Sequence, residues 1–173
     1  MATFVRYEQG GVARHGEVRD GLIHPLKGTF PEFSQTNEPT VGLDDVKLLA
    51  PILPSKIVAI GPGYNVYMQG APGPERPYYW IKPASALQDP EGDIRLPPGI
   101  TVNHEAEIAI VIGRRARKVS PDEAMDYVFG YTACNDVTGG DMADRAAYLQ
   151  TQLFLDGKIF DTFAPLGLSL IHI

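Results

Sequence analysis

The chain has 173 residues, 44% of them hydrophobic, and a formal net charge of −6 at pH 7. This length suits one typical domain, or a small domain beside part of a larger one, and the apolar content is enough for a buried core. The negative charge excludes nucleic acid and anionic membranes as general partners, and the single cysteine, Cys134, excludes an intrachain disulfide. The chain has no signal-peptide pattern and no apolar stretch of membrane-spanning length, so we expect a soluble, cytoplasmic protein.

Short strands joined by glycine turns are predicted for the N-terminal part of the chain. Residues 4–7, 12–15 and 16–18 read as strands around Gly10-Gly11, and Asp20-Gly21 is a strong tight-turn dipeptide. The pattern predicts a small β-rich unit.

A polar stretch at residues 30–40 leads from this unit to a second one. Residues 56–60, with the sequence KIVAI, are predicted to form the first buried strand of the second unit. We place the boundary near Leu53, which gives a β-rich N-terminal domain at residues 1–52 and a larger domain at residues 53–167.

Two carboxylates stand on alternate residues at the start of the β-prone run at residues 104–113. Side chains alternate between the two faces of a strand, so Glu105 and Glu107 are expected to point the same way. Two like charges held that close need a compensating cation or a raised pKa. The ordinary alternative for this pair alone is that both carboxylates are solvated on an edge strand.

A capped helix and a strand follow this run. Ser120-Pro121-Asp122-Glu123 is typical of a capping box and predicts a helix that continues to about Val128. Residues 130–134 are predicted as a strand that delivers Asp136 at its end. Asp136 is therefore the natural third oxygen donor, although a turn residue following Asn135 is the ordinary alternative.

Three carboxylates with open coordination positions favour Mg²⁺ or Mn²⁺ over Ca²⁺, which takes more protein ligands. The summed negative charge of three carboxylates exceeds the charge of a divalent ion. An anionic substrate would therefore need a nearby cation, and Lys82 and Lys158 are the candidates.

Six motifs occur together in a fixed order and spacing. They are KIVAIG at residues 56–61, IKPASAL at 81–87, HEAE at 104–107, YVFGY at 127–131, NDVT at 135–138 and KIFDTFAPLG at 158–167. Each is weak alone, but the set is specific. In the order and spacing of these six motifs, the chain resembles the fumarylacetoacetate hydrolase superfamily.

The resemblance implies an α+β fold, mainly β: a mixed β-sandwich roll behind a small β-rich N-terminal unit. It also implies a homodimer and an Mg²⁺ or Mn²⁺ ion bound by residues matching Glu105, Glu107 and Asp136. Family members act on small 2-oxo acids and acylpyruvates, including intermediates of aromatic catabolism, by C–C hydrolysis, decarboxylation, hydration or isomerisation.

The resemblance further implies a catalytic or substrate-binding lysine at Lys158 and another lysine at Lys82. Tyr64 and Thr162 are the other expected substrate contacts. A 2-oxo carboxylate can chelate the metal, so that charge developing on its keto oxygen forms beside the cation. Lys158 would orient the substrate carboxylate or help to stabilise the enolate.

Two departures from the family pattern bear on the reaction. Hydrolytic members carry a histidine and a glutamate on a lid, where this chain has Tyr67 and Gly70, and tyrosine is a poor base at neutral pH because its pKa is about 10. The arginine after the aspartate motif is replaced by Gly140, although Arg145 could substitute. We therefore expect a tautomerase, isomerase or decarboxylase, with Tyr67 in the pocket; an acylpyruvate-type hydrolase or an inert fragment are the alternatives.

The last six residues, 168–173, have the sequence LSLIHI. This hexapeptide is what one frame of a common transposon-end sequencing adapter encodes, and family members continue well beyond this point. We expect a non-native tail on a reading frame cut short, so that the roll is incomplete at its C-terminal end.

Overall fold

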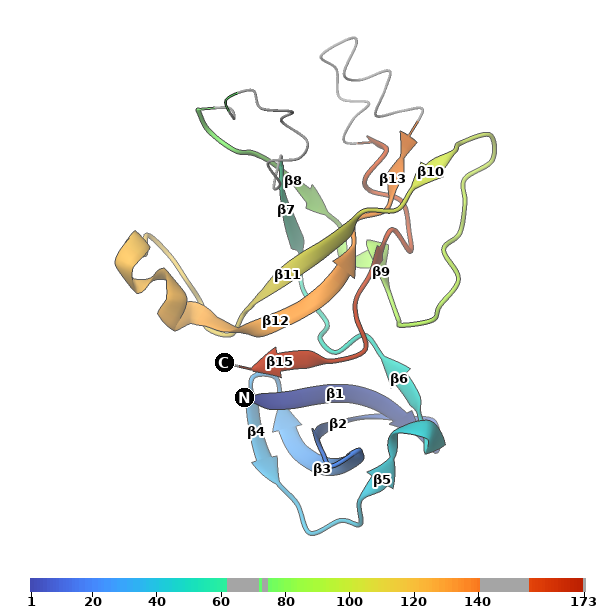
Figure 1. The fold of residues 1–173 in the computed structure, drawn as a ribbon, viewed down its shortest axis with the longest axis vertical. Helices are drawn as coiled ribbons and strands as arrows, with labels where there is room; N and C mark the ends of the chain where they lie inside the picture. The colour runs from blue at the N-terminus through green and yellow to red at the C-terminus, as the bar shows by residue number, and fades with distance from the viewer. Residues whose placement is uncertain (62–71, 73–74, 141–155, 173) are drawn as a thin grey trace.

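The computed structural model describes residues 1–61, 72, 75–140 and 156–172 and is built mainly of β-strands (Figure 1). Three 3₁₀ helices are complete within these residues. The helices are η1 Leu43–Asp45, η2 Ala84–Ala86 and η3 Pro121–Tyr127; the strands are β1 Ala2–Gln9, β2 Val12–Arg19, β3 Leu22–Thr29, β4 Glu32–Gln35, β5 Val41–Gly42, β6 Lys47–Leu49, β7 Ile57–Gly61, β8 Tyr78–Lys82, β9 Leu87–Gln88, β10 Val102–Asn103, β11 Ala106–Ile112, β12 Val128–Asn135, β13 Thr138–Gly139, β14 Ala164–Pro165 and β15 Leu170–His172.

The N-terminal strands β1 to β4 form an antiparallel meander, as the glycine turns predict. Asp20 and Gly21 both adopt positive φ, 50° and 77°, the backbone of the turn that suits a two-residue hairpin. Val5, Tyr7 and Ile23 form the buried centre of this unit. The small β-rich unit expected from the sequence is therefore present.

Gly16 on β2 lets the hairpin close over this centre. A Cβ at residue 16 would lie 2.2 Å from Cγ2 of Ile23, far inside van der Waals contact. Glycine is thus required here by packing, because β1 and β3 both approach β2 at this point.

One continuous sheet runs from this unit into the rest of the molecule in the order β11-β12-β15-β1-β2-β3-β4. The short strand β15 lies between the two parts: His172 pairs with Ala2 on one side and with Gly130 on the other. Figure 1 accordingly shows the N- and C-termini side by side. The C-terminal hexapeptide expected as a non-native tail supplies this connecting strand.

The hairpin β7–β8 differs from the sequence prediction. Residues 56–60 are predicted to form a buried strand, but Val58 and Ile60 on β7 are 52% and 63% exposed. Ile81 and Tyr79, their partners on β8, are also exposed, while the opposite face carries Ala59 and the fully buried Lys82. The strand is correct and its burial is wrong, because an apolar run does not reveal how many of its faces are covered.

The predicted helix after Ser120 forms, but as a 3₁₀ helix rather than an α-helix. The hydroxyl of Ser120 donates to the carboxylate of Glu123 over 2.7 Å, and no residue of η3 is buried. Without a buried face, the segment has no packing that would stabilise regular α-helical turns.

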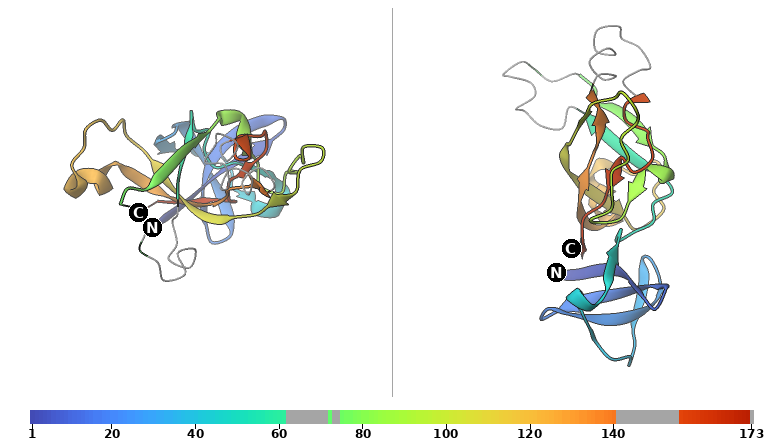
Figure 2. Two further views of the ribbon diagram at one scale, coloured as in Figure 1. Left: turned by 90° about the horizontal axis from the view of Figure 1, so that it is seen from above. Right: turned by 90° about the vertical axis from the view of Figure 1, so that its right-hand side faces the viewer.

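The molecule is elongated, with the β1–β5 unit at one end and the strands β7 to β14 above it (Figure 2). None of the helices among the described residues is long and apolar enough to cross a bilayer.

Candidate active site

The strand pair β11–β12 brings two of the predicted carboxylates together. The register pairs Ala106 with Asn135, which places Glu105 opposite Asp136 just beyond the ends of the two strands. The amide of Asp136 donates to the carbonyl of Glu105 over 2.9 Å, and the amide of Glu105 donates to Oδ1 of Asn135 over 3.0 Å. These bonds hold the two backbones in contact.

Lys158 lies between the two carboxylates. Its Nζ is 2.7 Å from Oε2 of Glu105 and 2.9 Å from Oδ2 of Asp136, and its side chain is only 2% exposed. The ammonium also lies 4.9 Å from the centre of the Trp80 ring, within the range of a cation–π contact. A lysine that the sequence places far from both carboxylates is therefore their shared counter-ion.

Lys82 is the second buried cation and has a different set of contacts. Its Nζ donates to three backbone carbonyls, those of Val137 at 3.0 Å, Lys158 at 2.7 Å and Phe163 at 2.9 Å. It also lies 2.7 Å from Oδ1 of Asp136. Burial lowers the pKa of Lys82, while the negative charge of Asp136 opposes that effect.

These contacts involve every N–H group of the Lys82 ammonium. An ammonium has three N–H donors, and here the three carbonyls and Oδ1 of Asp136 share them. Lys82 thereby ties Asp136 to the backbone of Lys158 and to the loop that carries Phe163, and its expected contact with substrate stays a prediction.

Thr138 completes the network and was not singled out from the sequence. Its Oγ1 lies 2.9 Å from Oε1 of Glu105, to which it can donate, and 3.0 Å from the carbonyl of Asp136. Thr138 is 2% exposed. Its place in the NDVT motif, two residues after Asp136, was the signal that could have identified it.

Glu107 shares a strand face with Glu105, as predicted, since Glu105 and Glu107 are half-buried while Ala106 and Ile108 are exposed. The register places Glu107 opposite Cys134. Glu107 forms no ion pair with any described residue. The structure thus brings two of the three predicted ligands into contact and leaves the third one pleat away.

The donor chemistry of this site fits a hard divalent cation. Oδ1 of Asp136 is buried and accepts no hydrogen bond within the described part of the chain, although the charge of Lys82 lies beside it. The neighbouring donors are carboxylate oxygens, the type that Mg²⁺ and Mn²⁺ prefer. In the conformation observed, however, the described residues hold no group of three or more potential ligands close enough to bind an ion.

Thr162, Tyr64 and Tyr67 are the remaining predicted site residues. Thr162 is buried with φ of 69°, and its Oγ1 accepts a 2.9 Å hydrogen bond from the amide of Arg95. This contact supports the loop and leaves the O–H of Thr162 able to donate, so the expected substrate contact stays a prediction. Tyr64 and Tyr67 lie outside the described residues, as do Gly70 and Arg145.

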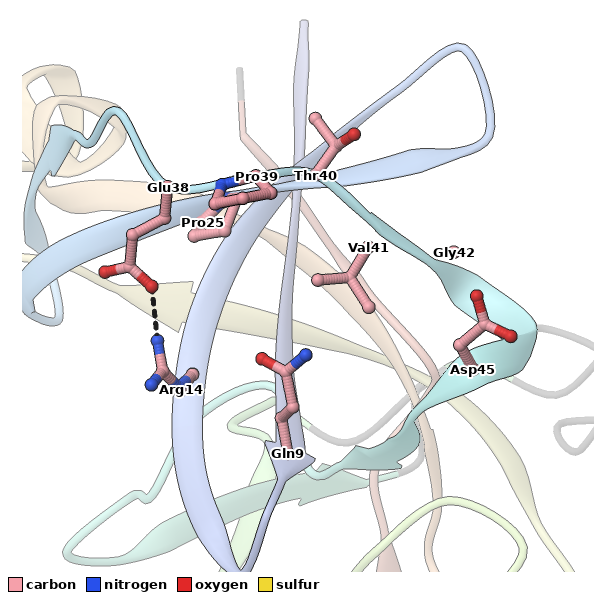
Figure 3. A pocket seen from close by; sticks show the side chains of 9 residues that line it. All are labelled: Gln9, Arg14, Pro25, Glu38, Pro39, Thr40, Val41, Gly42 and Asp45. Carbon is pink, nitrogen blue, oxygen red and sulfur yellow. Dashed lines mark hydrogen bonds and ion pairs between the residues drawn. The ribbon is translucent and has the colours of Figure 1, made fainter.

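A hollow of about 390 Å³ lies on the N-terminal unit and is separate from this network (Figure 3). Arg14 and Glu38 form a 2.6 Å ion pair at its rim. None of the predicted site residues lines the hollow. The candidate active site is therefore the buried carboxylate and lysine network itself.

Two family models match this chain. Residues 56–172 match the model described as fumarylacetoacetate (FAA) hydrolase C-terminal. The chain belongs to the fumarylacetoacetate hydrolase family. The preceding residues 3–51 match a model described as Rv2993c-like, N-terminal.

A named member of the fumarylacetoacetate hydrolase family is similar to this chain in sequence. The oxaloacetate tautomerase fahd2 of Xenopus laevis, named as mitochondrial, is 38% identical over 140 residues, which cover 79% of this chain and 43% of that protein. This chain thus spans less than half the length of that relative.

Solved structures of the family share the fold. The 2-hydroxyhepta-2,4-diene-1,7-dioate isomerase of Mycobacterium marinum superposes with a TM-score of 0.84 at 30% identity, covering 99% of this chain and 66% of that one. The fumarylacetoacetate hydrolase of Exiguobacterium antarcticum superposes with a TM-score of 0.82 at 27% identity, covering 99% of this chain and 67% of that one. The mainly β, roll-type fold expected from the sequence is thereby confirmed.

Proposed function

We propose that this chain is part of a divalent-metal-dependent enzyme that interconverts the keto and enol forms of a small 2-oxo acid or 2-hydroxy-dienoic diacid. The observation that carries the proposal is the buried network in which Lys158 bridges Glu105 and Asp136. A tautomerase and an isomerase among the relatives support the same reaction class.

The chain's own residues account for binding and positioning in this reaction. Glu105, Asp136 and, from the next pleat, Glu107 would hold Mg²⁺ or Mn²⁺. When bound, such an ion would supply positive charge where negative charge develops on the keto oxygen of the substrate. Lys158 would face the substrate carboxylate or its developing enolate oxygen and serve as the catalytic cation.

Lys82 and Thr138 have supporting roles. Lys82 holds Asp136 at one end of the network, and Thr138 orients Glu105 at the other. Tyr64 and Tyr67 stay predicted pocket residues. Proton transfer needs only a positioned acid or base next to the enolising carbon, so no activated water is required.

Hydrolysis of an acylpyruvate is the second candidate, because the fumarylacetoacetate hydrolase of Exiguobacterium antarcticum shares the fold. The replacement of the family's histidine and glutamate by Tyr67 and Gly70 weighs against it. Decarboxylation of a 2-oxo acid uses the same charge stabilisation, and an inert fragment remains the non-catalytic alternative.

The direct test follows the ultraviolet absorbance of enol oxaloacetate as it converts to the keto form in the presence of Mg²⁺. We expect the chain to accelerate this decay and Lys158→Met to lose at least a hundredfold of the acceleration. Lys56→Met, at an exposed lysine, is the control and should retain the full rate. An unchanged rate in Lys158→Met would refute the catalytic assignment. Release of pyruvate without faster enol decay would favour the decarboxylase, and release of oxalate and acetate would favour the hydrolase.

The homodimer and the cytoplasmic location remain predictions. Ile108, Ile110 and Ile112 on β11 are 69%, 58% and 52% exposed and form an apolar row beside an edge that pairs with no described strand. Such a row is consistent with a surface that a second copy covers. Light scattering of the purified chain tests the dimer: a monomer mass over the micromolar range would contradict it.

A further inference from the structure

The contacts of the four carboxylate oxygens in the network leave little room for an additional cation. Oε2 of Glu105 and Oδ2 of Asp136 both face Nζ of Lys158, at 2.7 Å and 2.9 Å. Oε1 of Glu105 faces the hydroxyl of Thr138 at 2.9 Å, and Oδ1 of Asp136 faces Nζ of Lys82 at 2.7 Å. Every oxygen that could bind a metal from these two residues therefore already has a neighbour.

The formal charges of the network already balance. Glu105 and Asp136 contribute two negative charges, and Lys82 and Lys158 contribute two positive charges in the same buried space. A divalent ion added to the same oxygens would lie only a few ångströms from at least one ammonium. Repulsion at that separation is strong in a buried site, where solvent screens it weakly.

The two lysines are held by different groups. Lys82 is anchored by three backbone carbonyls in addition to Asp136. Lys158 is paired with the two carboxylates, and the face of Trp80 offers its ammonium a cation–π contact on one side. A metal ion bound to Oε2 of Glu105 and Oδ2 of Asp136 would take the oxygens that Lys158 contacts, so Lys158 is the cation that it would displace.

We propose that the ammonium of Lys158 and a divalent metal ion compete for the carboxylates of Glu105 and Asp136, so that metal entry displaces Lys158 toward an anionic ligand. This inference rests on the proposed function and specifies the order of binding: the metal binds first and makes Lys158 available for the substrate. Metal uptake and anion binding are then coupled through one side chain.

Calorimetric titration with Mn²⁺ tests the competition without any activity assay. Lys158→Met removes the charge but keeps an unbranched apolar side chain against Trp80. We expect this variant to bind Mn²⁺ at least tenfold more tightly than the unmodified chain, while Lys56→Met matches the unmodified chain. Equal or weaker Mn²⁺ binding by Lys158→Met would overturn the competition and leave the proposed function standing.

Oxalate, a mimic of a 2-oxo acid enolate, probes the second half of the inference. With Mn²⁺ saturating, the Lys158→Met variant should bind oxalate at least tenfold more weakly than the unmodified chain, because the released ammonium is missing. Equal oxalate affinity would contradict the release of Lys158. Absence of Mn²⁺ binding in every form of the chain would overturn both this inference and the metal-dependent function.

A measurement on the unmodified chain covers the case in which Lys158→Met does not fold. In protein labelled with ¹³C at the lysine side chains, Mg²⁺ should shift the Cε signal of one of the two buried lysines strongly and leave the exposed lysines unchanged. A titration in which no buried lysine signal moves while Mg²⁺ binds would refute the displacement.

Discussion

Asp136 lies directly opposite Glu105 across the β11–β12 pair, and its amide donates a 2.9 Å hydrogen bond to the carbonyl of Glu105. The two carboxylates are thus held together by the backbone of paired strands and not by their side chains alone. Carboxylates this close repel each other unless a cation lies between them, and in this structure that cation is Lys158. This arrangement leads to predictions that separate binding roles from structural ones.

Replacing Glu107 with glutamine should remove Mn²⁺ binding with little change in stability. Glu107 forms no ion pair with the described residues, so its loss leaves no buried charge uncompensated, and the free energy of unfolding should change by less than about 0.5 kcal/mol. Calorimetric titration and chemical denaturation measure the two effects. Retained Mn²⁺ binding would show that Glu107 is not a ligand.

Replacing Lys82 with methionine should destabilise the chain by about 3 kcal/mol, because it breaks a buried ion pair and leaves three buried carbonyls without a donor. Urea denaturation measures the loss. The control Lys47→Met, at an exposed lysine, should be neutral. A variant of normal stability whose only defect is a raised KM would instead support the substrate-binding role first expected for Lys82.

Replacing Thr138 with valine should cost about 1 kcal/mol of stability and lower kcat/KM, since Glu105 loses the hydroxyl that faces its Oε1. Thr138→Ser keeps the hydroxyl and should retain the stability and the kcat/KM of the unmodified chain. If serine and valine behave alike, the methyl group rather than the hydroxyl of Thr138 is what the site needs.

Replacing Gly16 with alanine should destabilise the N-terminal unit by about 1–3 kcal/mol, the usual cost of overpacking. The added Cβ would meet Cγ2 of Ile23. Combining the change with Ile23→Ala, which removes that atom, should cost less than the sum of the two single changes. Strict additivity in thermal or urea unfolding would show that the contact with Ile23 is not the cause.

His15 should make the stability of the chain depend on pH. Burial, and to a lesser extent the charge of Arg6, lowers the pKa of His15 below its ordinary value of 6.5. The unfolded chain then takes up the proton first, so the contribution of His15 is complete above about pH 6.5 and is lost as the pH falls through the lower folded pKa. The difference in unfolding free energy between the chain and His15→Gln should shrink over that range, and a difference that is constant with pH would contradict this.

Local sequence patterns predicted much of the secondary structure. The Asp20-Gly21 turn, the strands around it and the alternation that places Glu105 and Glu107 on one face all follow from short-range rules of backbone and pleat geometry. Such rules depend only on neighbouring residues. They misjudged β7, because the burial of Val58 and Ile60 depends on segments far away in the chain.

The network at the candidate active site could be predicted only in part. The carboxylate types and the two lysines were identifiable as candidates from their order and spacing. That Lys158 lies between Glu105 and Asp136, or that Thr138 faces Glu105, involves contacts between residues far apart in the sequence. Such contacts leave no periodic pattern in the sequence from which they could be predicted.

The amino-acid sequence by itself determined the strands, the turns and the residue types that suit an oxygen-donor site, because these depend on local conformation and side-chain chemistry. Tertiary structure alone decided which charges meet. It brought Lys82 against three backbone carbonyls and made Lys158 the counter-ion of two carboxylates, since burial removes water and each charge must be paired within the protein.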